Sequence, residues 1–477
     1  MSIFSMNHQN YPVLEGTKET EVCIIGGGIA GLNLAFLLKQ SGKKVIVVEA
    51  ETIGHAQSSR STAKITCLPG FLYHDLMEQS GLNEAMKAAR CMRSALQKYA
   101  DILYHHQINC QFERLPFLLF SKDSQRIKKE AEAMKKLNFH VKTEHQKTVF
   151  GEGEVLILEN QAQFHPGLWM EHISKGLEIY EHSRVIHVED HDVFTAKGRV
   201  RANKIVFCDH YPFVNFPGMH FMKMSQERSH VLALSNVKRE EMMLYCADEP
   251  IESLRFSNHT ALYSGFSHPA GKGEADVIEQ MKRKAKERFP QCEIESCWSA
   301  QDCMTLDGLP YIGLFSGTKQ NWYVSTGFNK WGMIYSMVSA MILHDKICGT
   351  ENIDASVFDS LRSILNHPAN ELKLTCNAAS GWMKEWFTVP NLQMSEIPKN
   401  EGALIELDGM SLGCYHDEDD TYYLVSTRCP HLKCQLTWNG AEKSWDCPCH
   451  GSRYDRYGNR IEGPAESQTI LIRKEKQ

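Results

Sequence analysis

The chain has 477 residues, of which 42% are hydrophobic and 23% are charged, and its formal net charge is -6. A chain of this length exceeds what one hydrophobic core supports, so two or three domains are expected. The small negative charge and the lack of a long basic run argue against nucleic acid as a partner, and they favour small molecules or other proteins.

The first ten residues lack the basic region and apolar core of a signal peptide, so none is predicted. The most apolar long stretch, residues 322–343, contains Asn329, Lys330 and two glycines, which argues against a membrane span. Four of the sixteen cysteines lie in two C-terminal loops, and the other twelve are scattered without paired spacing, as is typical of reduced thiols. These features predict a cytoplasmic protein.

A strand, a glycine-rich turn, a helix and a second strand follow one another over residues 21–49. In such a series the first glycine permits a tight turn, the second lets the backbone approach a pyrophosphate, and the third lets the helix pack on the sheet. An acid at the end of the second strand can hold a ribose hydroxyl. The alternative is a purely structural turn. The residues expected to hold a dinucleotide are Gly26, Gly28, Gly31 and Glu49.

Residues 54–66 are small, polar and basic, and such a loop can wrap the rest of a dinucleotide. Together with the fingerprint, this loop resembles the D-amino-acid oxidase (DAO) superfamily of flavoproteins. The resemblance implies FAD, held by the N-terminal fingerprint and again by a distant C-terminal segment. It also implies that Arg60, Thr62 and Lys64 line the cofactor. Alternatively, Arg60 and Lys64 are solvated surface charges.

The middle of the chain alternates helical apolar spacing with short apolar runs typical of strands. The resemblance implies that the first two of these strands return to the FAD-binding domain, with the backbone of Val185 at the adenine side. The later strands suit an antiparallel sheet in a substrate domain. The predicted helices cover 83–107 and 124–137, and the predicted strands cover 184–188, 204–208, 229–234 and 262–266.

A second glycine turn, residues 327–333, follows a predicted strand and opens a helix. The N–H groups and the positive dipole end of that helix suit a flavin carbonyl, which gains negative charge on reduction. This segment resembles the closing motif of the DAO superfamily. The resemblance places Lys330 near the flavin ring and the substrate carboxylate, although Lys330 can also simply be exposed. Along the cofactor it places Asp307, Gly327, Lys330, Trp331, Gly332 and Met333.

Some relatives in this superfamily tether FAD through a cysteine near the closing segment, where this chain has Cys303. The lack of an activating base nearby in the sequence favours non-covalent FAD, and a covalent link through Cys303 is the alternative. A terminal helix is predicted over 352–373, and the small polar residues 377–381 mark a domain boundary. Trp382 and Trp386 are candidates to anchor the linker that follows.

Two loops near the C-terminus each contribute one cysteine and one histidine: Cys429 with His431, and Cys447 with His450. This is the ligand set of a [2Fe-2S] centre with two thiolates on one iron and two imidazoles on the other. Zinc is the alternative, but zinc fingers usually take both cysteines from one loop and both histidines from another.

The sequences of these two loops resemble those of Rieske proteins of the type found in cytochrome bc complexes. The resemblance implies a disulfide between Cys434 and Cys449, which would be unusual in a reducing cytosol. It also implies that Ser452 and Tyr454 donate hydroxyl hydrogen bonds to cluster sulfur. Such donors stabilise the reduced state, so a potential at the high end of the Rieske range is predicted. Alternatively, Ser452 and Tyr454 are ordinary loop residues.

The predicted fold is an α/β FAD-binding Rossmann-like domain with an interleaved α+β substrate domain, plus a small all-β Rieske domain. The predicted limits are a flavoprotein at 1–375, a linker at 376–388 and the iron-sulfur domain at 389–477. Within the flavoprotein, the FAD-binding parts are about 18–82, 151–211 and 300–372, and the substrate domain is about 83–150 and 212–299.

A flavin accepts two electrons together, while a [2Fe-2S] centre carries one at a time. The chain has one dinucleotide fingerprint, so electrons are expected to enter from a substrate at the flavin. The leading hypothesis is a dehydrogenase for an amine or amino-acid-like substrate, with an electron acceptor or donor protein as partner. The alternatives are an electron-transfer module without its own substrate, an assembly role, and an oxidase. The sequence offers no clean acid/base pair, and the candidates are Lys330, Tyr263, His268 and Arg228.

Overall fold

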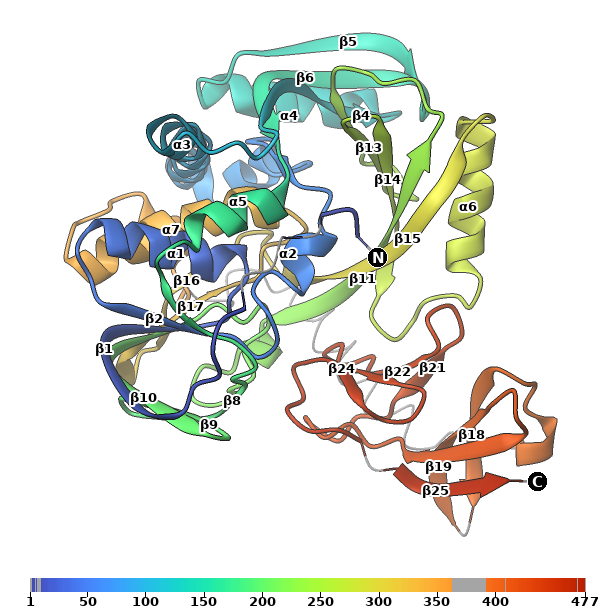
Figure 1. Ribbon diagram of the computed structural model, residues 1–477. Coiled ribbons are helices and arrows are strands. Elements are labelled where there is room, and N and C mark those ends of the chain that lie inside the picture. Colours follow the sequence, from blue (N-terminus) through green and yellow to red (C-terminus); the bar gives the residue numbers. More distant parts are fainter. Residues whose placement is uncertain are drawn as a thin grey trace. The chain divides into compact units, whose positions relative to one another are not determined.

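The computed structural model describes residues 2–4, 6, 10–362, 392–407, 409–469 and 471–476. The chain divides into two compact units, whose elements are labelled in Figure 1. Two segments from the middle of the sequence belong to the same unit as the C-terminal residues. The first unit comprises Met1–His210, Ser229–Phe266 and Lys282–Arg362, and the second comprises Tyr211–Arg228, Ser267–Met281 and Ser363–Gln477.

An eight-stranded, mostly parallel sheet forms the α/β part of the first unit, in the order β16-β17-β10-β1-β2-β7, with β9 and β8 added beside β10. The parallel neighbours β1 and β2 are joined by α1 (Ile29–Gln40), since a parallel pair needs a crossover connection. This confirms the strand, helix and strand series predicted from the sequence. The strands are β1 Gly16–Ile25, β2 Val45–Val48, β7 Glu178–Tyr180, β8 Val185–Glu189, β9 Asp192–Thr195, β10 Gly198–Phe207, β16 Tyr311–Ser316 and β17 Lys319–Thr326.

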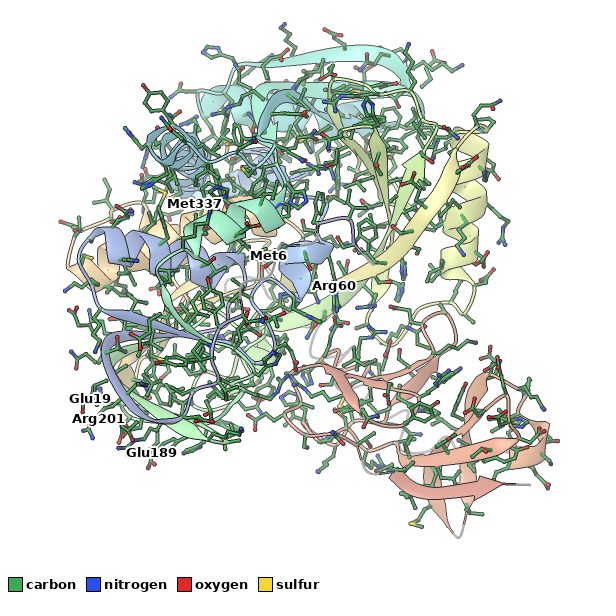
Figure 2. The ribbon with its side chains drawn as sticks, viewed as in Figure 1. Met6, Glu19, Arg60, Glu189, Arg201 and Met337 are labelled. Atoms are coloured by element: carbon green, nitrogen blue, oxygen red, sulfur yellow. A yellow bond between two sulfur atoms is a disulfide. The ribbon has the colours of Figure 1, made fainter. Side chains whose placement is uncertain are left out.

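The helix α7 (Gly332–Cys348) contacts both α1 and α3 and is buried along most of its length. A helix with neighbours on several sides is apolar on several faces, so α7 lacks the single apolar stripe of a surface helix. Met337, labelled in Figure 2, is one of its fully buried residues. The short helix α5 (Pro166–Ile173) is capped by the preceding His165, whose side chain accepts from the N–H of Leu168.

The helix α3 (Tyr73–His106) is interrupted at Gly81, whose φ of 84° lies outside the helical region. Glycine adopts this conformation without the steric cost that a side chain would add. The helix predicted over 83–107 is confirmed, and a further helical stretch precedes the glycine. The helix predicted over 124–137 is confirmed as α4 (Ser124–Lys136), where Asp123 caps the first turn by accepting from the N–H of Arg126 at 3.0 Å.

The second sheet has nine strands, in the order β15-β11-β14-β13-β12-β4-β6-β3, with β5 paired to β6. Most of its pairs are antiparallel, as predicted for the substrate domain. Its strands are β3 Lys64–Ile65, β4 Glu113–Ser121, β5 Val141–Thr148, β6 Gly151–Gln163, β11 Met224–Ser235, β12 Met243–Cys246, β13 Glu252–Ser257, β14 Thr260–Pro269 and β15 Glu293–Thr305. The helix α6 (Val277–Arg288) lies between β14 and β15 in sequence.

The prediction of a helix over 352–373 is wrong for its described part. Residues Ala355–Phe358 form a short 3-10 helix, η2, instead. Asp354 accepts from Arg90 Nε at 2.8 Å, and Ser360 Oγ donates to a carbonyl of β16 at 2.6 Å. These tertiary bonds fix both ends of the segment in a conformation that an α-helix would not allow. The rest of the prediction, with the proposed linker, lies outside the described residues.

The described C-terminal part of the second unit contains two four-stranded antiparallel sheets, which confirms the small all-β domain. Gly413 and Gly402 let aromatic rings pack closely, because a Cβ atom at either would lie within 2.8 Å of Trp445 or Trp438. One sheet holds β18 Glu401–Leu407, β19 Met410–His416, β20 Thr421–Ser426 and β25 Leu471–Lys476. The other holds β21 Thr437–Asn439, β22 Ser444–Asp446, β23 Arg453–Asp455 and β24 Arg460–Glu462.

Candidate functional site

The glycine-rich turn between β1 and α1 leaves no room for side chains. Gly26 has a φ of 108°, and a Cβ atom there would lie 2.5 Å from the carbonyl oxygen of Cys208. A Cβ atom on Gly31 would lie 2.0 Å from the carbonyl oxygen of Gly26. Both glycines therefore allow the close backbone approach that the fingerprint requires.

The loop after the second strand folds against the start of α1. Gly28 gives no side-chain cap to this helix, and the N–H of Ile29 donates to Ser58 Oγ at 2.9 Å. Ser58 lies in the short helix α2 (Gln57–Arg60), which Figure 2 marks with Arg60. The structure thus brings the polar loop to the N-terminus of α1. Helix N-termini are suited to bind anions. The sequence did not single out Ser58, and its only signal is its position in that loop.

Glu49 lies beside the turn, as expected. Its Oε2 accepts from the N–H of Gly27 at 2.7 Å, and its Oε1 accepts from the N–H of Glu51 at 2.8 Å. Burial raises the pKa of Glu49. The N–H of Ser183 donates to the Glu49 carbonyl at 2.8 Å. Val185 of β8 stands two residues after Ser183, so its strand begins close to the backbone of Glu49.

Lys64 is buried, with 7% of its surface exposed. Its Nζ donates to Thr62 Oγ1 at 2.9 Å and to Ser253 Oγ at 2.8 Å, and burial lowers the pKa of Lys64 to about 7. The alternative of a solvated surface charge is therefore wrong for Lys64. Arg60 is half-buried, and its carbonyl accepts from Trp298 Nε1 at 2.8 Å.

The closing turn between β17 and α7 is held by one asparagine. Asn329 Oδ1 accepts from the N–H of Thr305 at 2.7 Å, and its Nδ2 donates to the Gly327 carbonyl at 2.8 Å. Gly327 and Lys330 both have positive φ, at 75° and 70°. The turn therefore has a fixed shape just before Gly332, the first residue of α7.

The residues beside this turn form a partly buried aromatic group. The Trp331 ring lies 5.8 Å from Phe117 and 5.2 Å from Tyr245, measured between centroids. Met333 is 3% exposed, and its carbonyl accepts from Tyr99 Oη at 2.8 Å. Trp331 and Met333 are therefore fixed in place at the start of α7.

Asp307 forms a bidentate pair with Arg362, with Nε–Oδ2 at 2.6 Å and Nη2–Oδ1 at 2.8 Å. The guanidinium also lies 4.0 Å from the centroid of the Tyr311 ring. Arg362 was missed because it stands 55 residues from its partner and belongs to no motif. This pair fastens the end of the first unit to the segment that precedes β16.

Two of the four catalytic candidates are engaged in buried ion networks. Tyr263 is fully buried and donates to Glu252, which also accepts from Arg288 Nε at 2.8 Å. Burial raises the pKa of Tyr263. Arg228, in the second unit, lies with Nη2 2.5 Å from Glu442 Oε1.

The other two catalytic candidates are Lys330 and His268. Lys330 is half-buried on the closing turn described above. His268 belongs to the second unit, and its Nδ1 is bonded to the Pro269 carbonyl at 3.0 Å. Of the four, only Lys330 lies on a segment expected to line the flavin.

The two cysteine-histidine loops of the second unit share one backbone pattern. The N–H of Cys429 donates to the Cys434 carbonyl at 2.8 Å, and the N–H of Lys433 donates to the Cys429 carbonyl at 2.9 Å. The second loop repeats this pattern. The N–H of Cys447 donates to the Ser452 carbonyl, and the Cys447 carbonyl accepts from the N–H of Gly451. Equivalent turns therefore present one cysteine and one histidine from each loop.

Both histidines have the form that a metal ligand needs. The rings of His431 and His450 are perpendicular, with centroids 5.0 Å apart, and the Nδ1 atom of each is buried without a hydrogen-bond partner. Burial lowers the pKa of His431 to about 4 and that of His450 to about 3, so both rings are neutral. A neutral imidazole with an unpartnered nitrogen is suited to bind a metal.

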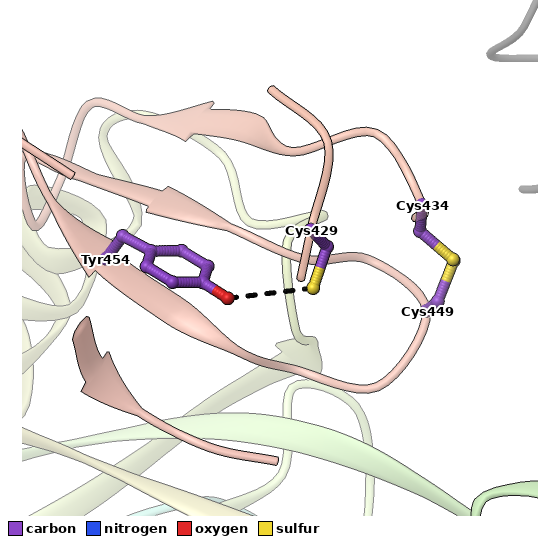
Figure 3. The surroundings of a disulfide bond; sticks show 4 residues. All are labelled: Cys429, Cys434, Cys449 and Tyr454. Atoms are coloured by element: carbon purple, nitrogen blue, oxygen red, sulfur yellow. Dashed lines mark hydrogen bonds between the residues drawn. A yellow bond between two sulfur atoms is a disulfide. The ribbon is translucent and has the colours of Figure 1, made fainter. Parts of the chain in front are cut away.

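The thiols complete a donor set of two sulfur and two nitrogen atoms. Hydrogen bonds, first from the Cys447 thiol and then from groups that include Tyr454 and Ser452, lower the pKa of Cys429. Tyr454 Oη lies 3.7 Å from Cys429 Sγ. Figure 3 draws this hydrogen bond as a dashed line. Two cysteine sulfurs and two neutral imidazoles are the donors that a Rieske [2Fe-2S] cluster takes, so the residues present fit such a cluster.

The disulfide between Cys434 and Cys449 is confirmed, and Figure 3 shows it beside Cys429. The sulfur atoms of Cys434, Cys447 and Cys449 lie within 4.8 Å of one another. Two of these three are joined to each other and have no thiolate to offer, so this group is not a ligand set. The disulfide instead links the two loops.

Comparisons with known proteins follow the division into a flavin part and an iron-sulfur part. The family described as FAD dependent oxidoreductase matches residues 21–346, and the Rieske [2Fe-2S] domain matches residues 386–473. YhfW of Bacillus subtilis (strain 168), which is named as a Rieske 2Fe-2S iron-sulfur protein, is 32% identical over 96% of this chain and 94% of its own length. The cytochrome b6-f complex iron-sulfur subunit of Trichodesmium erythraeum is 44% identical over 50 residues, which are 10% of this chain and 28% of that subunit.

Solved structures show the same fold for the flavin part. L-proline dehydrogenase from P. horikoshii has a TM-score of 0.61 and 16% identity, and the match covers 72% of this chain and 98% of that one. Glycine oxidase from Geobacillus kaustophilus has a TM-score of 0.60 and 15% identity, over 73% of this chain and 100% of that one.

Fold and site together define a flavoprotein that carries an iron-sulfur domain. The chain belongs to the family of FAD dependent oxidoreductases, and its C-terminal part is a Rieske [2Fe-2S] domain. It is thus an oxidoreductase whose cofactors are FAD and a [2Fe-2S] cluster, as the sequence predicted. No helix within the described ranges is both long and apolar enough to cross a membrane.

Proposed function

We propose that the protein is a dehydrogenase that oxidises an amine or amino-acid-like substrate and passes the electrons singly to a partner protein. The observation that carries this proposal is the presence, in one chain, of a flavin fingerprint and a quartet of two thiols and two imidazoles. A flavin takes electrons from a substrate in pairs, and a [2Fe-2S] cluster carries them one at a time. A chain with both can connect the two kinds of chemistry.

We assign the cluster to Cys429, Cys447, His431 and His450. The unpartnered Nδ1 atoms and the matched turns support this assignment. Ser452 and Tyr454 supply hydroxyl donors toward Cys429. We assign FAD to the residues that the sequence pointed to: Gly26, Gly28, Gly31, Glu49, Arg60, Thr62, Lys64, Val185, Asp307, Gly327, Lys330, Trp331, Gly332 and Met333.

The substrate class rests on two observations. The names of the two solved structures above refer to amino acids, proline and glycine. In this chain, Lys330 offers a cation on the turn expected to face the flavin, which suits a substrate carboxylate. Its backbone φ of 70° and the bonds of Asn329 hold that turn in one shape.

The test is anaerobic mixing of the purified holoprotein with a panel of amines and amino acids. One member is expected to bleach the flavin absorbance and then reduce the cluster, as measured by electron paramagnetic resonance. The Cys447→Ser variant, which lacks one proposed ligand, should bleach with the same substrate and show no cluster signal. Bleaching without any cluster reduction in the wild type would contradict the proposed relay.

An electron-transfer module without its own substrate is the second candidate. The observation in its favour is that Tyr263 and Arg228 are engaged in buried ion networks, which leaves them unsuited to acid/base work. No bleaching by any member of a wide panel, with rapid reduction by a protein donor, would favour this function.

A further inference from the structure

Residues 211–228, which we call the histidine cover, belong to the same unit as the two ligand loops. The cover contains the short helix η1 (His220–Met222), and the Phe221 ring within it faces both histidines. Its centroid lies 6.3 Å from that of His431 and 6.0 Å from that of His450. Tyr211, at the start of the cover, lies 6.5 Å from His450. The two imidazoles thus share an aromatic wall from a distant part of the sequence.

Hydrogen bonds join the cover to each histidine. His431 Nε2 lies 2.7 Å from Asn215 Oδ1, and an amide oxygen only accepts, so Nε2 carries the hydrogen and donates it. This leaves Nδ1 of His431 as the nitrogen without a hydrogen. On the other loop, Gln226 Nε2 donates to the His450 carbonyl at 2.6 Å, and the Phe221 backbone hydrogen bonds with the His450 ring.

A buried charge network fixes the end of the cover. Arg228 is 3% exposed, and its Nη2 and Nη1 lie 2.5 Å from Glu442 and 3.1 Å from Glu462. Arg453, on β23, contacts the same two carboxylates at 3.3 Å and 3.5 Å. Buried pairs of this kind hold a segment firmly, since breaking one leaves an uncompensated charge.

We propose that the histidine cover is a built-in shield for the ligand histidines, and that Asn215 is a positioning residue that tunes the cluster. This inference rests on the proposed function for the identity of the ligands. Asn215 fixes the tautomer and orientation of His431. By accepting from Nε2 it also makes the imidazole a more basic ligand. Nε2 of His431 already has a hydrogen-bond partner, and the Phe221 ring packs against both imidazoles. External electron carriers therefore dock elsewhere on the protein.

The sign of the tuning follows from electrostatics. A more basic ligand stabilises the oxidised cluster, which carries more positive charge, so Asn215 lowers the reduction potential. Asn215→Ala removes the acceptor and should shift the reduction equilibrium toward the reduced form by about tenfold, the size of one hydrogen bond to a charged group. Asn215→Asp provides a stronger acceptor and should shift the equilibrium the other way.

The potentials are measured at one pH by redox titration of the holoprotein, followed by electron paramagnetic resonance. The matched control is Met222→Ala, a change at a side chain in the same segment that is 52% exposed. The expected order of potentials is Asn215→Asp lowest, wild type and Met222→Ala in the middle, and Asn215→Ala highest. Shifts of both Asn215 variants in one direction, or no shift in either, would overturn the role of Asn215.

A second measurement needs only the wild type. Diethylpyrocarbonate modifies accessible imidazole nitrogens, and mass spectrometry gives the rate at each histidine. We expect His431 to react about tenfold more slowly than the exposed His259, because its Nε2 hydrogen bond must break first. Asn215→Ala should abolish most of this protection. Equal rates at the two histidines in the wild type would overturn the shield.

Different results would refute the ligand assignment and the histidine cover. A wild type that binds iron and sulfide but shows no Rieske-type resonance would refute the ligand assignment and the inference with it. A wild type with that resonance, but with unprotected histidines and unshifted Asn215 variants, would refute the histidine cover alone. If Asn215→Asp assembles no cluster, the potential of the alanine variant and the labelling rates still test the role of Asn215.

Discussion

Replacing Tyr454 by phenylalanine is expected to lower the reduction potential of the cluster. Tyr454 is fully buried, and its hydroxyl lies 3.7 Å from Cys429 Sγ. A sulfur ligand carries more negative charge after the cluster gains an electron, so this hydrogen bond is stronger in the reduced state. Phenylalanine keeps the ring in the core around Trp445 and removes only the donor.

The size of the shift follows from the energy of one hydrogen bond. We take the difference between the two oxidation states as about 1 kcal/mol, in the middle of the range for a single bond. For a one-electron couple, a tenfold change in the equilibrium corresponds to about 59 mV. The Tyr454→Phe variant should therefore have a potential about 40 mV below that of the wild type.

The assay is a redox titration followed by visible circular dichroism, with wild type and variant at the same pH. The matched control is Tyr422→Phe, because Tyr422 is also buried, at 3% exposure, and stacks on His416 at 4.3 Å in the other sheet. Its potential should equal that of the wild type. A Tyr454→Phe protein with an intact cluster and an unchanged or higher potential would refute the reasoning.

Three further substitutions test the flavin turn, the buried ion network of the second unit and a buried carboxyl group. Gly26→Ala should yield protein without FAD, because its Cβ would lie 2.5 Å from a carbonyl oxygen. Gly42→Ala, with φ of 77° and open space, should keep the flavin absorbance. Arg228→Met should lose about 3–5 kcal/mol of unfolding free energy, seen as a lower urea midpoint for loss of the cluster signal. The more exposed Arg239→Met should lose under about 1 kcal/mol, and equal midpoints for the two would contradict this. Glu130 is buried, and burial raises its pKa to about 7, above its ordinary value of 4.5. The folded state therefore holds this proton more tightly, and its contribution to stability falls as pH rises from about 4.5 to about 7. Glu130→Gln should remove a fall in unfolding free energy of about 3 kcal/mol over that window, measured by urea titrations at several pH values, and an unchanged slope would count against the assignment.

The parts of the site that the sequence predicted are governed by neighbours in the chain. The glycine turn needs Gly26 because of its own backbone angle and the strand beside it. The two ligand loops close on themselves through backbone bonds five residues apart, from Cys429 to Cys434 and from Cys447 to Ser452. Short motifs describe such local geometry well, because the residues that determine it stand inside the motif.

The parts that were missed depend on partners far along the chain. Arg362 holds Asp307 from 55 residues away, and Asn215 meets His431 across 216 residues. Neither arginine nor asparagine is unusual where it stands, so no local pattern marks them. The predicted helix is wrong over its described part, 352–362, for the same reason, since the side chains of Asp354 and Ser360 hydrogen bond to other elements of the fold.

The charge balance of the second unit shows why the histidine cover matters to the iron-sulfur domain. Within the contiguous residues 389–477, Arg453 faces the carboxylates of Glu442, Glu462 and Asp446, the last at 3.0 Å. Buried carboxylates need paired cations. Arg228, from the cover, supplies a further cation. The unit that holds the cluster is therefore larger than the contiguous Rieske match, and a substitution at Arg228 should be tolerated only together with the loss of a carboxylate.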